Sequence, residues 1–270
     1  MSFEQLKEKA CNIRKNIVQM IHDANSGHPG GSLSAVEILT YLYFEEMNIN
    51  SPEDENRDRF ILSKGHAAPV LYATLAEKGF IDKESLKTLR KINSKMQGHP
   101  DMKKVKGVEA STGSLGQGLS IANGMAYGFK MDNKPNRVFV LLGDGEVQEG
   151  MVWEAEMFAG HNKLSNVTAF LDNNGLQIDG KNEEVMSIQP LDKKWEAFGW
   201  SVITINGNSF EEIAKAMEER KKITDKPVMI IAKTVKGKGV SFMENNPGWH
   251  GKAPNDEELA LALKDRGGNK

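Results

Sequence analysis

VFVLLGDGEVQEG, residues 138–150, carries an unbroken apolar run straight into an aspartate that stands between two glycines. An apolar run without alternation is typical of a strand that is buried on both faces, as the strands of parallel sheets are. The polar, helix-forming residues that follow predict a helix over 147–162. Ligands of open α/β sheets bind beyond the carboxyl ends of the strands, so Asp144 is predicted to lie at a ligand site.

The rest of the chain shows the same alternation of strands and helices. The patterns predict strands at 59–63, 137–142, 166–171, 201–205 and 227–234, and helices at 4–24, 33–44, 67–79, 84–92, 119–131, 147–162 and 209–223. Such alternation implies right-handed crossovers, so we expect an α/β fold, a parallel sheet with helices on both faces. We expect a single domain over residues 1–270, with a frayed charged tail at 263–270. The Gly- and Pro-containing segment 26–32 should form a loop, with Ser32 or Ser34 capping the next helix.

The composition argues against several classes of protein. The formal net charge is −2 and the arginines form no basic stripe, which predicts no binding to nucleic acid. Cys11 is the only cysteine, so no disulfide can form within the chain and a reducing compartment is expected. The apolar stretches are about five residues long, whereas a membrane-spanning helix needs about 20. The sequence therefore predicts a cytoplasmic protein that does not enter the membrane.

A second polar side chain is expected beside Asp144. Asn174 follows the next predicted strand, 30 residues further on, a separation that suits one crossover helix. A carboxylate and a neutral amide oxygen together suit magnesium or calcium rather than zinc. Gly143 and Gly145 would let the backbone approach a phosphate, and a helix starting near Glu146 would point its amide dipoles there, with the Glu146 carboxylate turned elsewhere. Taken singly, Asp-Gly and Asn-Gly are also common turn pairs, so each segment alone is compatible with a plain turn.

Several motifs along the chain resemble those of the transketolase family, in the order that the family has them. They are SGHPG (26–30), LSKGHAAPVLYATL (62–75), GHP (98–100), STGSLGQG (111–118), GDGEVQEG (143–150), DNNGLQIDG (172–180) and KTVKGKG (233–239). The resemblance extends from about residue 5 to residue 260. Deoxyxylulose-phosphate synthase and pyruvate dehydrogenase share the GDG…N pattern, but LSKGH and SGHPG fit transketolase better. The resemblance implies the thiamine diphosphate-binding fold of the diphosphate-binding (PP) domain.

The resemblance also implies a cofactor site made of thiamine diphosphate and magnesium, with calcium or manganese as substitutes. Asp144, Asn174 and the backbone carbonyl of Leu176 would be the metal ligands, with diphosphate oxygens and water completing the coordination. Gly145 and Asn174 would also contact the cofactor. The segment near the aminopyrimidine ring would be Gly113, Ser114 and Leu115, where the family more often has proline at the position of Ser114.

Four of the six histidines fall in segments that supply the active-site histidines of the family. By that resemblance His28 and His99 would contact oxygens of the ketose donor. His66 would contact the diphosphate or the reacting hydroxyl, and His250 both cofactor and substrate. An imidazole with an ordinary pKa near 6.5 can donate to hydroxyls and move protons near neutral pH. Without the resemblance, each would be interpreted as a surface or structurally bonded residue.

A complete transketolase is more than twice as long as this chain, which implies a partner. The partner would be a C-terminal transketolase subunit that carries the pyrimidine-binding domain, and Glu149 would lie at the interface with it. Together they would transfer a two-carbon ketol unit from a ketose phosphate to an aldose phosphate, in the pentose phosphate pathway, as a heterotetramer. Two alternatives remain: a sister enzyme (deoxyxylulose-phosphate synthase-like or a specialised sugar transketolase), and a non-catalytic protein that binds the cofactor.

The other glycine-rich features have simpler interpretations. VKGKGV (235–240) lacks the spacing of a Walker A motif, so Lys236 and Lys238 are expected to be solvated charges. Helix-interior glycine otherwise reduces stability, so four glycines are expected to permit close helix packing. These are Gly116, Gly118, Gly124 and Gly128.

Overall fold

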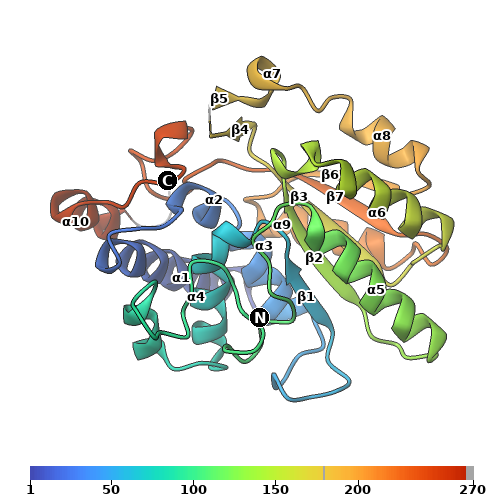
Figure 1. Ribbon diagram of the computed structural model, residues 1–270, viewed down its shortest axis with the longest axis horizontal. Helices are drawn as coiled ribbons and strands as arrows, with labels where there is room; N and C mark the ends of the chain where they lie inside the picture. Colours follow the sequence, from blue (N-terminus) through green and yellow to red (C-terminus); the bar gives the residue numbers. More distant parts are fainter. Residues whose placement is uncertain (179, 266–270) are drawn as a thin grey trace.

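A five-stranded parallel sheet forms the centre of the computed structural model, which describes residues 1–178 and 180–265 (Figure 1). In spatial order its strands are β1 (Arg59–Leu62), β2 (Val138–Gly143), β3 (Val167–Asn173), β7 (Val228–Lys233) and β6 (Ser201–Asn206). All four neighbouring pairs run parallel. The five predicted strands and the predicted parallel α/β architecture are confirmed.

Helices cover both faces of the sheet (Figure 1). On one face lie α1 (Phe3–Asp23), α2 (Pro29–Leu33), α3 (Val36–Tyr41), α4 (Ala68–Lys78) and α9 (Phe210–Arg220). On the other lie α5 (Gln117–Met131), α6 (Gly150–His161) and α8 (Leu191–Ala197). Alternate residues of β2 enter the two cores, Phe139 and Leu141 on the first face and Val140 and Leu142 on the second. This explains the unbroken apolar run, because both faces of the strand are buried.

The remaining elements are short or peripheral. A small hairpin, β4 (Leu176–Gln177) and β5 (Gly180–Lys181), and α7 (Asn182–Val185) follow β3. The helix α10 (Asp256–Lys264) packs on α1 and includes residues 263 and 264 of the predicted frayed tail; residues 266–270 of that tail lie outside the described residues. In the part of the chain that the structure describes, no helix is long and apolar enough to cross a membrane.

Three local predictions are wrong. Segment 26–32 is not all loop, because Pro29 starts the short helix α2, a position in which proline favours helix. Neither Ser32 nor Ser34 caps α3: the Ser32 hydroxyl donates to the carbonyl of His28, and the Ser34 hydroxyl to Asp172. The predicted helix at 84–92 is a 3₁₀ helix over Lys83–Thr88.

The predicted role of the four glycines at and after the start of α5 holds for half of them. A Cβ at Gly118 would lie 2.4 Å from Oγ of Ser63, and one at Gly116 would lie 2.8 Å from Cγ of Met151, so close packing requires glycine at both positions. At Gly124 and Gly128 a Cβ would meet nothing within 4 Å. The packing interpretation is therefore wrong for these two, which lie on the exposed side of α5.

The core behind α6 contains a carboxyl group without a partner. The side chain of Glu156 is fully buried (0% exposed), and neither of its oxygens has a hydrogen-bond partner among the described residues. Burial raises the pKa of Glu156 to about 8, against a weaker opposing effect of Lys194. The folded chain therefore binds a proton here that the unfolded chain releases above its ordinary pKa of 4.5.

Glu156→Gln is expected to remove a pH dependence of stability. Because the folded pKa lies above the unfolded one, wild type should lose stability as the pH rises from about 4.5 to about 8. The variant should lack that slope, so it gains about 2–4 kcal/mol over wild type between pH 5 and pH 8. Urea unfolding at several pH values measures this, with the exposed Glu154→Gln on the same helix as control. Parallel pH curves for wild type and Glu156→Gln would contradict the assignment.

Candidate active site

A cavity of about 300 Å³ opens at the carboxyl end of the sheet and collects most of the predicted site residues. The segments after β1, β2, β3 and β7 all contribute to it, as expected for an open parallel sheet. The predicted residues that line it are His28, His66, His99, Gly113, Leu115, Asp144, Gly145, Asn174, Leu176 and His250. Segments separated by more than 200 residues in the sequence thus meet in one place.

Asp144 links the ends of two neighbouring strands. Its buried carboxylate (2% exposed) accepts hydrogen bonds from the backbone N–H of Gly145 (2.9 Å) and of Gly175 (2.6 Å), so the loops after β2 and β3 meet, as predicted. Burial, with a further contribution from the nearby Asp172, raises the pKa of Asp144 to about 6. A cation beside such a buried carboxylate would stabilise its charged form.

Asn174 and Leu176, two residues that line the cavity with Asp144, carry neutral oxygens. Oδ1 of Asn174 accepts from the N–H of Leu176 (3.2 Å), and the carbonyl of Leu176 lies 3.4 Å from Nζ of Lys236. The described residues contain no group of three or more His, Cys, Asp and Glu side chains suited to a metal. A cation here would be held by one carboxylate and neutral oxygens, the arrangement of magnesium sites that rely on phosphate and water for the remaining ligands.

The segment after Asp144 differs from the prediction in one respect. Residues Glu146–Gln148 form only a 3₁₀ turn, and α6 begins at Gly150. The prediction that a helix starting near Glu146 directs its dipole at this site is therefore wrong. The Glu146 carboxylate does point elsewhere, as predicted: it accepts from the N–H groups of Gly143 and Gly116 (both 2.9 Å) and from the Ser63 hydroxyl. It is a structural acceptor that ties the 116 loop to the turn after β2.

Three histidine rings form a cluster in the cavity. The ring centroids of His28, His66 and His250 lie 5.2, 5.3 and 5.4 Å apart. Burial is the main cause that lowers the pKa of His66 to about 2 and those of His28 and His250 to about 4. His99, whose ring lies against Gly113, also has a lowered pKa through burial and Arg90. All four are therefore neutral at pH 7 and act as hydrogen-bonding groups, whereas imidazoles with an ordinary pKa would be partly protonated at this pH.

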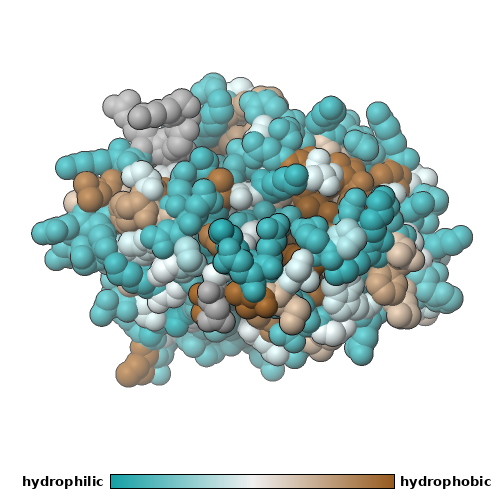
Figure 2. Space-filling model, turned by 90° about the horizontal axis from the view of Figure 1, so that it is seen from above, coloured by the Kyte–Doolittle hydropathy of each residue, from teal (hydrophilic) through white to brown (hydrophobic). Residues whose placement is uncertain are grey.

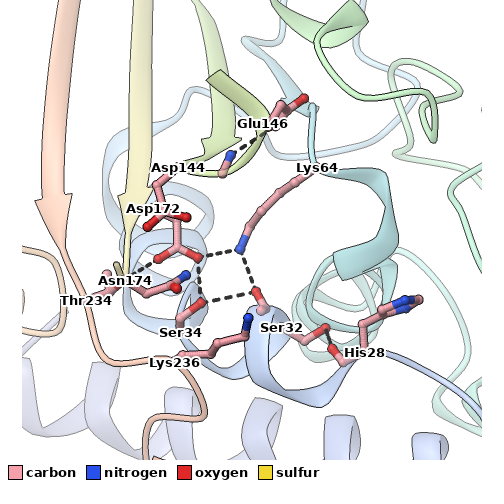
Figure 3. A network of polar contacts seen from close by, with 12 residues as sticks. His28, Ser32, Ser34, Lys64, Asp144, Glu146, Asp172, Asn174, Thr234 and Lys236 are labelled. Carbon is pink, nitrogen blue, oxygen red and sulfur yellow. Dashed lines mark hydrogen bonds and ion pairs between the residues drawn. The ribbon is translucent and has the colours of Figure 1, made fainter. Parts of the chain in front are cut away.

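A buried ion pair beneath the cavity was missed by sequence reasoning (Figure 3). Lys64 forms an ion pair with Asp172, and its Nζ also donates to the carbonyl of Gly31 (2.6 Å). Asp172 accepts further hydrogen bonds from the hydroxyls of Ser34 and Thr234. The available signal was position: Lys64 lies just after strand β1 and Asp172 lies near the end of β3.

Lys236 is the clearest correction to the predicted charges. It is 2% exposed, not solvated, and lines the cavity with Nζ 3.2 Å from Nδ1 of His250. Burial lowers its pKa to about 8. The loop is drawn inward because the N–H of Gly237 donates to the carbonyl of Gly30 (3.0 Å). Lys238 is partly exposed and pairs with Glu244 (3.2 Å), closer to the prediction.

Two predicted site residues do not line the cavity. Ser114 is exposed between Gly113 and Leu115, which do line it, and Glu149 is exposed at the start of α6. Their roles, a contact near the aminopyrimidine and a subunit interface, remain predictions.

Comparisons with known proteins agree with this geometry. The family model described as "Transketolase, thiamine diphosphate binding domain" matches residues 6–270. The 6-deoxy-6-sulfo-D-fructose transketolase subunit SqwG of a Clostridium species is 45% identical over 96% of this chain and 95% of its own length. An apulose-4-phosphate transketolase subunit of Phocaeicola vulgatus is 42% identical over 98% and 95%. The solved transketolase of Campylobacter jejuni superposes with a TM-score of 0.92 at 36% identity, over 99% of this chain but 43% of that one. The chain thus spans about two fifths of the solved enzyme.

Proposed function

The chain belongs to the family of the transketolase thiamine diphosphate-binding domain, and from that premise we propose that it is the cofactor-binding subunit of a two-subunit transketolase. The assembled enzyme transfers a two-carbon ketol unit from a ketose phosphate to an aldose phosphate. The observation that carries the proposal is the buried Asp144 carboxylate in the same cavity as four neutral histidines. A cation site and a set of neutral hydrogen-bonding groups for sugar oxygens are what such a transfer needs.

The residues around Asp144 would hold the magnesium ion and the diphosphate. Asp144, Asn174 and the carbonyl of Leu176 are the metal ligands in this proposal. A Cβ at Gly145 would meet protein only at 3.4 Å or more, so packing within the chain does not require glycine there, and the space would be available to the diphosphate. When bound, thiamine diphosphate supplies the nucleophilic carbon and the electron sink that cleavage next to a carbonyl requires.

The four histidines would bind the oxygens of the sugar. Because His28, His66, His99 and His250 are neutral at pH 7, each carries one ring N–H that can donate to a hydroxyl or carbonyl oxygen of the sugar. A protein that only bound the cofactor would not need groups that bind sugar oxygens, which argues against a purely cofactor-binding protein. Lys236 adds a positive charge beside the expected diphosphate.

The proposed partner is a C-terminal subunit that carries the pyrimidine-binding domain. Two relatives of this chain's length bear the word subunit in their names, which supports a divided enzyme. Figure 2 shows separate brown, hydrophobic patches on one largely hydrophilic face of the molecule. Exposed apolar side chains lie on α5 and α6, at the cavity and at the end of α7. They include Tyr127, Met131, Met157, Phe158, Ile178, Val185 and Met186. Patches of this kind suit subunit contacts, and we propose a cytoplasmic heterotetramer with Glu149 at the interface.

The comparisons offer a specific alternative for the identity of the sugar substrate. The names of the two relatives give 6-deoxy-6-sulfo-D-fructose and apulose-4-phosphate as their sugars. A specialised sugar transketolase is therefore an alternative to an enzyme of the pentose phosphate pathway. Product analysis of the assembled enzyme with a panel of ketose donors separates the two.

The purified chain by itself is expected to show no ketol transfer, because the cavity lies open at the surface where the partner would close it. Activity should appear when the partner, captured with the tagged chain and identified by mass spectrometry, is added back with magnesium and thiamine diphosphate. Matched additions of the partner alone serve as control. Robust turnover by the isolated chain would contradict the two-subunit proposal.

A further inference from the structure

Arg90 lies beside His28, one of the residues that line the cavity. It adopts a left-handed backbone conformation (φ 58°), unusual for a residue with a side chain, and its N–H donates to the carbonyl of Met96 (2.8 Å). A Cβ at Gly98 would lie 2.6 Å from Cζ of Arg90, so the guanidinium rests directly on the backbone of Gly98. Although Arg90 is exposed, its charged group is held against the segment that carries His99.

The surface on which Arg90 rests is itself anchored. The hydroxyl of Tyr72, on α4, lies 3.0 Å from the carbonyl of Gln97 and 3.3 Å from that of His99. No carboxylate of the described residues forms an ion pair with Arg90. Its guanidinium is instead directed at an imidazole: Nη2 donates to Nδ1 of His28 at 3.5 Å.

That contact favours a lone pair on Nδ1 of His28. A guanidinium has N–H donors and no acceptor, so the nitrogen that faces it must offer a lone pair. A neutral His28 then has its proton on Nε2. No hydrogen-bond partner of Nε2 is found among the described residues, and the atom lies near Gly251, where a Cβ would be 3.9 Å away. The Nε2–H group is therefore available to a ligand of the cavity.

We propose that Arg90 is a positioning residue of the sugar site, which fixes His28 in the Nε2–H tautomer so that His28 meets a sugar oxygen as a hydrogen-bond donor. The inference rests on the proposed function, in which His28 contacts the ketose. The groups that face His28 are Arg90, His99, Lys236, His66 and His250, and none of them is acidic. With burial as the largest cause, they keep the pKa of His28 at about 4, so the ring stays neutral in the working range of pH.

The tautomer can be measured directly on the full chain. Histidines labelled with nitrogen-15 distinguish protonated from unprotonated ring nitrogens, and His28→Gln assigns the signals of His28. Wild type is expected to show the Nε2–H form alone. Arg90→Met should give a mixture of both tautomers, Arg90→Lys should largely restore the wild-type form, and Lys91→Met, which removes a charge from the same turn, should leave it unchanged.

In the assembled enzyme, Arg90→Met should lower kcat/KM by about tenfold at pH 7. The acid limb of the pH profile of kcat/KM should move to higher pH in this variant, because loss of the Arg90 charge raises the pKa of His28. The proposal would be overturned if His28 of the wild-type chain carried its proton on Nδ1. It would also be overturned if Arg90→Met showed the same tautomer and the same acid limb of kcat/KM as wild type. If wild-type assemblies transfer no ketol unit, the proposed function fails, while the tautomer measurement still decides the role of Arg90.

Discussion

Asp144→Ala is expected to abolish magnesium-dependent binding of thiamine diphosphate to the assembled enzyme. The variant removes the carboxylate at the centre of the proposed metal site, whose other oxygens are neutral. Loss of groups that merely orient ligands already weakens metal binding by about 10–100-fold, so loss of this ligand should weaken it by at least about 100-fold. Calorimetric titration of the cofactor, with and without magnesium, measures the change.

A second variant separates charge from loop geometry. Asp144→Asn keeps an oxygen that can accept from the N–H of Gly145 or Gly175 but carries no charge. It should bind the cofactor as poorly as Asp144→Ala if the charge of the carboxylate is what holds the metal ion. The exposed Asp132→Ala is the control. Wild-type affinity in Asp144→Asn would exclude the carboxylate from the metal site.

The sequence was sufficient to predict the sheet and the meeting of two strand ends. The strands had strong, unbroken apolar patterns, and the rule that ligands bind at their carboxyl ends placed Asp144 and Asn174 together. The histidines came only from the resemblance, because a histidine next to glycine or proline has no distinctive pattern by itself. His28, His66 and His250 are brought together by loops far apart in the sequence, a consequence of topology rather than of local preference.

Several of the errors share a physical cause, because a tertiary partner changed the local preference. Ser34 did not cap a helix because Asp172 accepts its hydroxyl hydrogen. Lys64 and Lys236 were not identified as buried groups because lysine is ordinarily solvated, and only the folded arrangement supplies their partners. The helix expected near Glu146 was replaced by a 3₁₀ turn whose glutamate is engaged by two backbone N–H groups.

Lys64→Met is expected to lower the free energy of unfolding by about 3–5 kcal/mol, the range for removal of one partner of a buried ion pair. Methionine approximates the length of the lysine stem, so the main change is the loss of the ammonium group. Asp172 would then remain as a buried carboxylate (0% exposed) near Asp144, with only the hydroxyls of Ser34 and Thr234 as donors. Urea unfolding at pH 7 measures the loss, and the exposed Lys87→Met should change stability by less than about 0.5 kcal/mol.

The double variant Lys64→Met/Asp172→Asn tests the reason for that loss. Asparagine keeps an oxygen for the hydroxyls of Ser34 and Thr234 but carries no charge, so the double variant should be more stable than Lys64→Met alone by about 2 kcal/mol or more. Such recovery means that the uncompensated charge of Asp172, rather than a packing defect, causes the destabilisation of Lys64→Met. A double variant no more stable than Lys64→Met would mean that Lys64 acts through its bond to the carbonyl of Gly31, and would remove the ion pair from the account of this site.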